Sequence, residues 1–152
     1  MNYTYRLADN NDLELFINLD KLMRLEDPNM CSEYDENLYR ENWFRYPIDS
    51  YDFGDIILCL NENQIIGRVD LMYERSYMNF SLVGYVDWIY VLPAYRGKGV
   101  GKRLLAEAEK HFKHKGCFKY YLFVAENEQA KKFYDKTDLV IEVIKTAQKK
   151  IN

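Results

Sequence analysis

The sequence predicts one domain of the α/β (α+β) class, with a mixed central sheet and helices on both faces. Its 152 residues suit a single compact unit, and 48% of them are hydrophobic, which is enough to bury a core. Segments of strand and helix periodicity follow one another in the order β-α-α-β-β-β-α-β-α-β. No apolar run has the length of a membrane-spanning helix or a signal peptide, so we expect a cytoplasmic protein with no membrane partner.

The first half of the chain predicts a strand, two helices and a hairpin. Asp9 offers an N-cap for the first helix, and apolar residues recur behind it at helical spacing. Ser32 offers a cap for the second helix, which is rich in aromatic residues. The polar turn Asn61-Glu62-Asn63 separates two apolar runs, as in a hairpin. We expect strands at 3–7, 56–60 and 64–73, and helices at 11–25 and 33–45.

The second half predicts three more strands and two helices. Residues 83–91 are apolar on both faces, which is typical of a strand in the middle of a sheet. Gly116 stands directly after a long amphipathic segment, where a glycine commonly ends a helix. We expect strands at 83–91, 118–125 and 139–144, and helices at 101–115 and 127–136.

Charge is divided unevenly between the two halves. Residues 1–91 hold 7 Lys/Arg and 17 Asp/Glu, a net of −10, whereas residues 92–152 hold 14 and 7, a net of +7. This asymmetry favours an anionic ligand on the C-terminal half and a cationic one on the N-terminal half, unless both are merely solvated faces. The lysines are scattered along helices without a basic tail, so we expect no nucleic-acid partner.

Cysteine and histidine positions predict no metal site. Cys31, Cys59 and Cys117 are odd in number and far apart, which favours a reducing compartment over a disulfide framework. His111 and His114 stand three residues apart without a third candidate ligand, so we expect a solvent-facing pair.

The segment that carries chemistry runs from the strand ending at Val91 through three alternate glycines into a helix. Glycines let a backbone approach a ligand closely, and a helix start presents free N–H groups and partial positive charge. The segment Gly97-Lys98-Gly99-Val100-Gly101-Lys102 therefore predicts an anion site suited to phosphate. It fits neither the Walker A spacing nor the dinucleotide fingerprint, because Lys102 precedes Arg103 and occupies the place of the last glycine.

The pattern Arg96-x-x-Gly99-x-Gly101 after Tyr90-Val91-Leu92-Pro93 resembles the signature of the GNAT superfamily of acyl-CoA-dependent N-acetyltransferases. Asn127-x-x-Ala130-x-x-Phe133-Tyr134-x-Lys136 is similar to the family's second motif, and Arg6-Leu7-Ala8-x-x-x-Asp12 to its usual opening. The resemblance implies one domain over 1–152, a mostly antiparallel sheet, and acetyl-CoA as cosubstrate without a metal. Two departures stand out: Asp138-Leu139 replaces the usual Gly-Phe, and the short C-terminal part leaves a sheet edge for another subunit, as in a homodimer.

The resemblance also implies how the cosubstrate is held. Pantetheine would lie along Ile89 and Val91, at the point where the central strands separate and a backbone N–H can stabilise the oxyanion. Asn127 would line its other side. The phosphates would lie against the residues of the glycine loop: Arg96, Gly97, Gly99, Gly101 and Lys102.

Two side chains are candidates for proton transfer. Tyr134 matches the tyrosine that often protonates the leaving thiolate, although it also fits a packed face with Phe133. Asp87 occupies the position where related enzymes commonly have a glutamate base. On a regular strand it would share an apolar face with Tyr85 and Ile89, which would raise its pKa. A structural carboxylate bonded to an arginine of the adjacent strand is the alternative.

The function that these features predict is an N-acetyltransferase acting on a primary amine by direct transfer in a ternary complex. The acidic N-terminal half favours a cationic small molecule or a Lys or N-terminal amine as acceptor. The aromatic residues of the second helix would form either an acidic, aromatic wall for that amine or one packed helix face (Tyr34, Tyr39, Trp43, Phe44 and Tyr46). The alternative is a non-catalytic CoA-binding or regulatory module of the same fold.

Overall fold

A computed structural model describes residues 2–26, 34–50, 52, 54–143, 145 and 147–149. Five strands form one sheet in the order β1-β2-β3-β4-β5. Neighbouring strands are antiparallel except β4 and β5, which are parallel, so the predicted mixed, mostly antiparallel sheet is confirmed. The strands are β1 (Thr4–Leu7), β2 (Gly54–Asn61), β3 (Gln64–Arg75), β4 (Leu82–Val91) and β5 (Lys119–Leu122).

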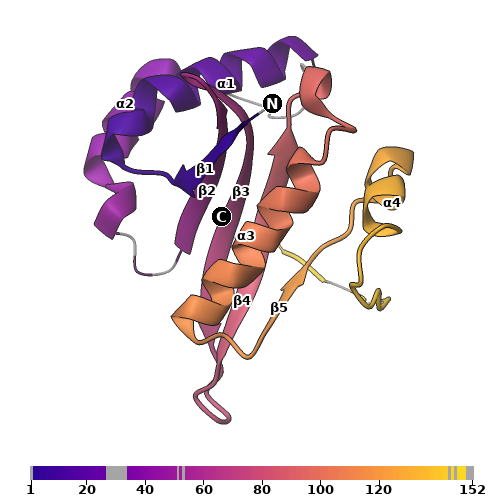
Figure 1. Cartoon of the computed structure of the whole chain (residues 1–152). Coiled ribbons are helices and arrows are strands. Elements are labelled where there is room, and N and C mark those ends of the chain that lie inside the picture. The colour runs from indigo at the N-terminus through magenta and orange to yellow at the C-terminus, as the bar shows by residue number, and fades with distance from the viewer. Residues whose placement is uncertain are drawn as a thin grey trace.

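Helices cover both faces of this sheet, as predicted (Figure 1). The guanidinium of Arg68 in β3 lies over the ring of Phe16 in the first helix. A Cβ built on the neighbouring Gly67 would instead lie 3.1 Å from Leu104 in the third helix. Because successive strand residues point to opposite faces, these two helices lie on opposite sides of the sheet. The helices are α1 (Leu13–Glu26), α2 (Glu36–Arg45), α3 (Val100–Lys115) and α4 (Glu128–Tyr134). Among the described residues, no helix is long and apolar enough to cross a membrane.

Helix α3 packs its predicted apolar face on the sheet and ends where the sequence indicates. Leu104, Ala108 and Phe112 are buried. A Cβ on Gly84 of β4 would lie 2.5 Å from the Phe112 ring, so only glycine lets this ring reach the strand. Gly116 caps the helix with φ of 85°, a left-handed conformation that glycine adopts without strain.

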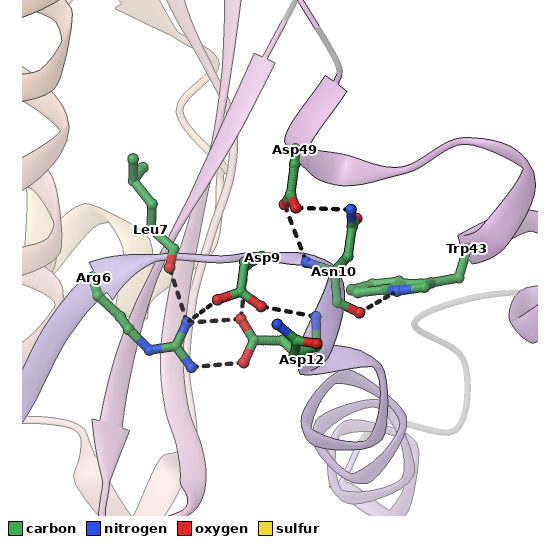
Figure 2. A network of polar contacts seen from close by, with 8 residues as sticks. Arg6, Leu7, Asp9, Asn10, Asp12, Trp43 and Asp49 are labelled. Carbon is green, nitrogen blue, oxygen red and sulfur yellow. Dashed lines mark hydrogen bonds and ion pairs between the residues drawn. The ribbon is translucent and has the colours of Figure 1, made fainter.

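A polar network ties β1 to the start of α1 (Figure 2). The Arg6 guanidinium donates two hydrogen bonds to the buried Asp12 carboxylate, of 2.6 and 2.7 Å. Asp12 also accepts the backbone N–H of Asp9, while Asp9 caps the short 3-10 helix η1 (Asn10–Asp12). Trp43 of α2 donates its indole N–H to the Asn10 carbonyl at 3.0 Å. The Arg6 and Asp12 of the opening motif therefore hold the N-terminal elements together.

Several predicted boundaries differ from the observed ones. The second helix begins at Glu36 rather than 33, because Asp35 accepts the N–H groups of Asn37 and Leu38, and the predicted cap Ser32 lies outside the described residues. The strand predicted at 118–125 forms only over β5. The helix predicted to end at 136 ends at Tyr134, where a turn begins.

The strand predicted at 139–144 is wrong over the described residues 139–143, which have no regular secondary structure. Val140 is 87% exposed and Val143 is 98% exposed. Apolar residues form strands when a neighbouring strand pairs their backbone and a core buries one face. In the described part of the chain no strand pairs with this segment, and although Leu139 packs against the core, Val140 and Val143 do not.

Candidate active site

A β-bulge interrupts the pairing of β3 with β4 at Asp87. Leu71 pairs with Val86 and Asp70 pairs with Trp88, so Asp87 is the extra residue on β4. Beyond a bulge the alternation of side chains shifts by one residue. Val91 accordingly faces α3, and its Cγ2 lies 3.7 Å from a Cβ built on Gly101. The bulge marks the place where β4 changes its relation to its neighbours.

On its other side, β4 separates from β5 at the same place. The two strands pair only from Val83 to Val86, opposite Lys119 to Leu122. In the described part of the chain, residues 87–91 of β4 have no strand partner on the β5 side, so a ligand can lie along this edge of the strand. The half-buried Ile89 and Val91 lie in this stretch, where the pantetheine is expected.

The glycine loop at the end of β4 is open in two places and packed in a third. Gly97 and Gly99 have φ of 73° and 82°, and a Cβ built on either meets nothing within 4 Å. A Cβ on Gly101 would lie 3.1 Å from the Phe133 ring, so this glycine lets α4 approach α3. Helix α3 starts at Val100 without a side-chain cap, which leaves its first N–H groups free for an anion. The open backbone of this loop fits a phosphate group.

Arg96 connects this loop to its surroundings. Its Nε donates to the Val91 carbonyl at 2.8 Å, and its guanidinium donates to Gln129 of α4 at 3.3 Å and lies over the Tyr90 ring. Arg96 is nevertheless exposed, as is Lys102 in the first turn of α3. Both cations therefore lie near the N-terminal end of α3, where the phosphates are expected.

The two candidate residues of the second motif, Asn127 and Tyr134, lie at opposite ends of α4. Asn127 caps α4, because its side-chain oxygen accepts the Ala130 N–H at 2.8 Å. Tyr134 ends the helix and is only 7% exposed. Burial raises the pKa of Tyr134, so its hydroxyl stays protonated at neutral pH.

Asp87 does not lie in the predicted apolar setting. The bulge leaves it exposed and separates it from the face of Ile89, so the prediction that assumed regular alternation is wrong. Burial raises the pKa of Tyr85, and the charge of the nearby Asp87 raises it further.

Asp70 is the carboxylate that sequence reasoning missed. Arg68 bonds its Oδ2 at 2.6 Å, so the arginine-paired carboxylate expected as an alternative for Asp87 lies on β3 instead. Burial raises the pKa of Asp70, and the charge of Asp87 adds to this, while Arg68 acts in the opposite direction. An arginine and an aspartate two residues apart inside an apolar strand were the signal that could have identified this pair.

The remaining candidates have mainly structural surroundings. Trp43 packs on Phe16 and Tyr39, as in a packed helix face, while Phe44 and Tyr46 are exposed. His111 is not solvent-facing as predicted, because its Nε2 lies 2.9 Å from the Asp55 carboxylate. Among the described residues, no group of three or more His, Cys, Asp or Glu is arranged to hold a metal.

Comparison with known proteins shows which family this chain belongs to. The profile of the Acetyltransferase (GNAT) family matches residues 19–138, and the chain belongs to this family. It is 32% identical over 74 residues to a glucosamine 6-phosphate N-acetyltransferase of Trypanosoma brucei brucei, covering 48% of this chain and 49% of that protein. It is 27% identical over 116 residues to a spermidine N(1)-acetyltransferase of Thermoplasma acidophilum, covering 68% and 69%. The chain thus spans about half the length of the first relative and about two thirds of the second.

The fold itself is shared with solved acetyltransferases over nearly the whole chain. An aminoglycoside acetyltransferase from an uncultured soil metagenomic sample, in complex with sisomicin, superposes with a TM-score of 0.78. The sequence identity is 18%, and the match covers 98% of this chain and 97% of that one.

Proposed function

We propose that the protein transfers an acetyl group from acetyl-CoA to a primary amine. The observation that carries this proposal is the separation of β4 from β5 at Asp87, in line with the open glycine loop. The edge of residues 87–91 that faces β5 would bind pantetheine through Ile89 and Val91. The loop and the first turn of α3 would bind the phosphates (Arg96, Gly97, Gly99, Gly101 and Lys102), with Asn127 on the other side.

The reaction proceeds by direct transfer in a ternary complex. The neutral amine nitrogen attacks the thioester carbonyl carbon, and a backbone N–H of β4 beyond the bulge stabilises the oxyanion. When the tetrahedral adduct collapses, the C–S bond breaks and CoA leaves as a thiolate. Both substrates held side by side supply most of the rate acceleration, because the chemistry becomes effectively unimolecular.

Two proton transfers complete the reaction. Asp87, exposed at the bulge, accepts the proton of the amine through a water molecule, because its side chain is short. Tyr134 donates a proton to the thiolate, and the raised pKa of Tyr134 keeps that proton available. Tyr134→Phe should lower kcat about tenfold to a hundredfold while the Kd for CoA stays the same. An unchanged kcat would assign Tyr134 to packing alone.

The acceptor that the charges favour is a cationic amine. Asp70 and Asp87 both lie at the bulge, and the N-terminal half carries the net negative charge. Spermidine and sisomicin, named with two of the similar proteins, carry several amino groups, which supports the same class of acceptor. A Lys side chain or an N-terminal amine of a peptide has the same reacting group.

Thiol release from acetyl-CoA, measured with a panel of amines, tests this function. We expect turnover with cationic primary amines and much less with neutral or anionic ones. Binding of CoA without turnover by any amine would favour the alternative, a non-catalytic CoA-binding or regulatory module.

We also propose that a second copy of the chain covers the edge beyond β5. No described strand pairs with that edge, and Phe118 and Phe123 next to it are 63% and 60% exposed. Open apolar edges are usually covered by another chain or element. Light scattering after size exclusion should give the mass of a dimer, and a monomer at micromolar concentration would contradict the proposal.

A further inference from the structure

The sheet face opposite α3 carries a strip of acidic and aromatic side chains next to the bulge. A Cβ on Gly84 points at Phe112 of α3, so the neighbouring Tyr85 points to the opposite face. Tyr121 of β5 stacks on Tyr85 at 4.9 Å, and Glu74 of β3 stands opposite Val83 on that same face. We call Glu74, Tyr85, Asp87, Tyr121 and Phe123 the acidic–aromatic strip.

The carboxylates of this strip lie beside tyrosine side chains. Burial raises the pKa of Tyr85 and of Tyr121, and the nearby carboxylates of Asp87 and Glu74, respectively, raise it further. In the described residues, neither Glu74 nor Asp87 forms an ion pair, and both are exposed. Tyr121 is 38% exposed beside them. Carboxylates next to open aromatic faces are the surroundings that bind an ammonium group.

A second observation at the bulge end of the strip points to a ligand. Oδ1 of Asp70 exposes less than 1 Å² and has no hydrogen-bond partner among the described residues, although Arg68 occupies Oδ2. A buried acceptor without a donor is rare in folded proteins and calls for one from outside the chain. Asp70 pairs with Trp88, the residue next to Asp87, so both carboxylates lie at the bulge end of the strip.

We propose that the strip is the acceptor subsite for a molecule with two amino groups far apart. The reacting amine lies between Asp70 and Asp87, and the distal ammonium is held by Glu74 over the rings of Tyr85 and Tyr121. Val83, opposite Glu74, is four residues from Asp87, which is about 13 Å along a strand. This inference rests on the proposed acetyl transfer and restricts its acceptor to long diamines or polyamines.

The test compares 1,8-diaminooctane with 8-aminooctan-1-ol, which has the same length but lacks the distal charge. We expect kcat/KM at least tenfold higher for the diamine with the wild-type protein, and a ratio below about three with Glu74→Gln. The amino alcohol should be used equally well by both within twofold. Because both substrates are measured on one preparation, the ratio does not depend on the fraction of folded protein.

Controls separate this inference from the proposed function. Glu62→Gln, in the exposed turn between β2 and β3, should keep the full preference for the diamine. The short pair 1,3-diaminopropane and 3-aminopropan-1-ol should show no such preference. Equal use of the two long substrates by the wild-type protein, or an equal loss for both in Glu74→Gln, would overturn the subsite while acetyl transfer stands. Absence of thiol release with every amine would overturn both.

Discussion

Two arginine–aspartate pairs of this protein, Arg6–Asp12 and Arg68–Asp70, differ in how completely they are satisfied. The Asp12 carboxylate accepts hydrogen bonds from two guanidinium nitrogens of Arg6 and from the backbone N–H of Asp9, and its side chain is 5% exposed. Burial alone would raise the pKa of Asp12, but these hydrogen bonds lower it below the usual value. Asp70 accepts a single hydrogen bond from Arg68, and burial raises its pKa. Among the described residues, its Oδ1 and the Nε of Arg68 have no hydrogen-bond partner.

The difference teaches where this fold keeps polar groups for a ligand. A fully bonded buried pair fixes two elements to each other and has nothing left to bind. A pair with a free buried acceptor and a free buried donor is unfavourable for the fold alone. The first pair connects β1 to the start of α1 (Figure 2), whereas the second lies beside the bulge at Asp87, where we propose that the acceptor binds.

Breaking the first pair should have the largest effect on stability. Arg6→Met leaves the buried Asp12 carboxylate without its bidentate partner, and we expect the free energy of unfolding to fall by about 2–3 kcal/mol. Urea denaturation at pH 7 measures this. Lys21→Met removes a more exposed cation paired with Glu36 and should lower it by less than about 1 kcal/mol. Equal losses in the two variants would contradict a structural role for the first pair.

Breaking the second pair should affect activity more than stability. Arg68→Met removes the cation that lowers the pKa of Asp70, so the pKa of that carboxyl rises further. We expect kcat/KM for a cationic acceptor to fall about tenfold and to recover as the pH is raised. Lys113→Met, which removes an exposed cation of α3, serves as the control. A loss that does not change between pH 7 and pH 9 would assign Arg68 to packing.

A third carboxylate sharpens the contrast through its pH dependence. Burial raises the pKa of Asp55, but hydrogen bonds from Tyr73, His111 and Lys115 lower it more, so the net shift is downward from 3.8. A carboxyl with a lowered folded-state pKa stabilises the fold above its unfolded value, and this contribution disappears as the pH falls through the folded value. Between pH 7 and pH 3, the free energy of unfolding of the wild-type protein should therefore fall by about 1 kcal/mol more than that of Asp55→Asn, as measured by urea denaturation. Parallel profiles would refute this.

The sequence predicted those features that depend on local patterns. The apolar spacing of α3 and Gly116 behind it indicated both the helix and its end, and the spacing of Arg96, Gly99 and Gly101 indicated the loop. The setting of Asp87 was mispredicted because a bulge depends on pairing with β3, which periodicity does not record. Asp70 was missed because an acid in an alternating strand looks like a solvent-facing residue.

The most direct test of the phosphate-binding loop compares two glycines that flank the same helix. Gly99 and Gly116 have φ of 82° and 85°, and a Cβ on either meets nothing within 4 Å. Alanine at either position strains the backbone by about 1–2 kcal/mol, but only Gly99 lies in the loop that we assign to the phosphates. Calorimetry with CoA should show one molecule bound per chain, unchanged affinity within twofold for Gly116→Ala, and at least tenfold weaker binding for Gly99→Ala. No heat with folded wild-type protein, or equal affinities in the two variants, would contradict the assignment.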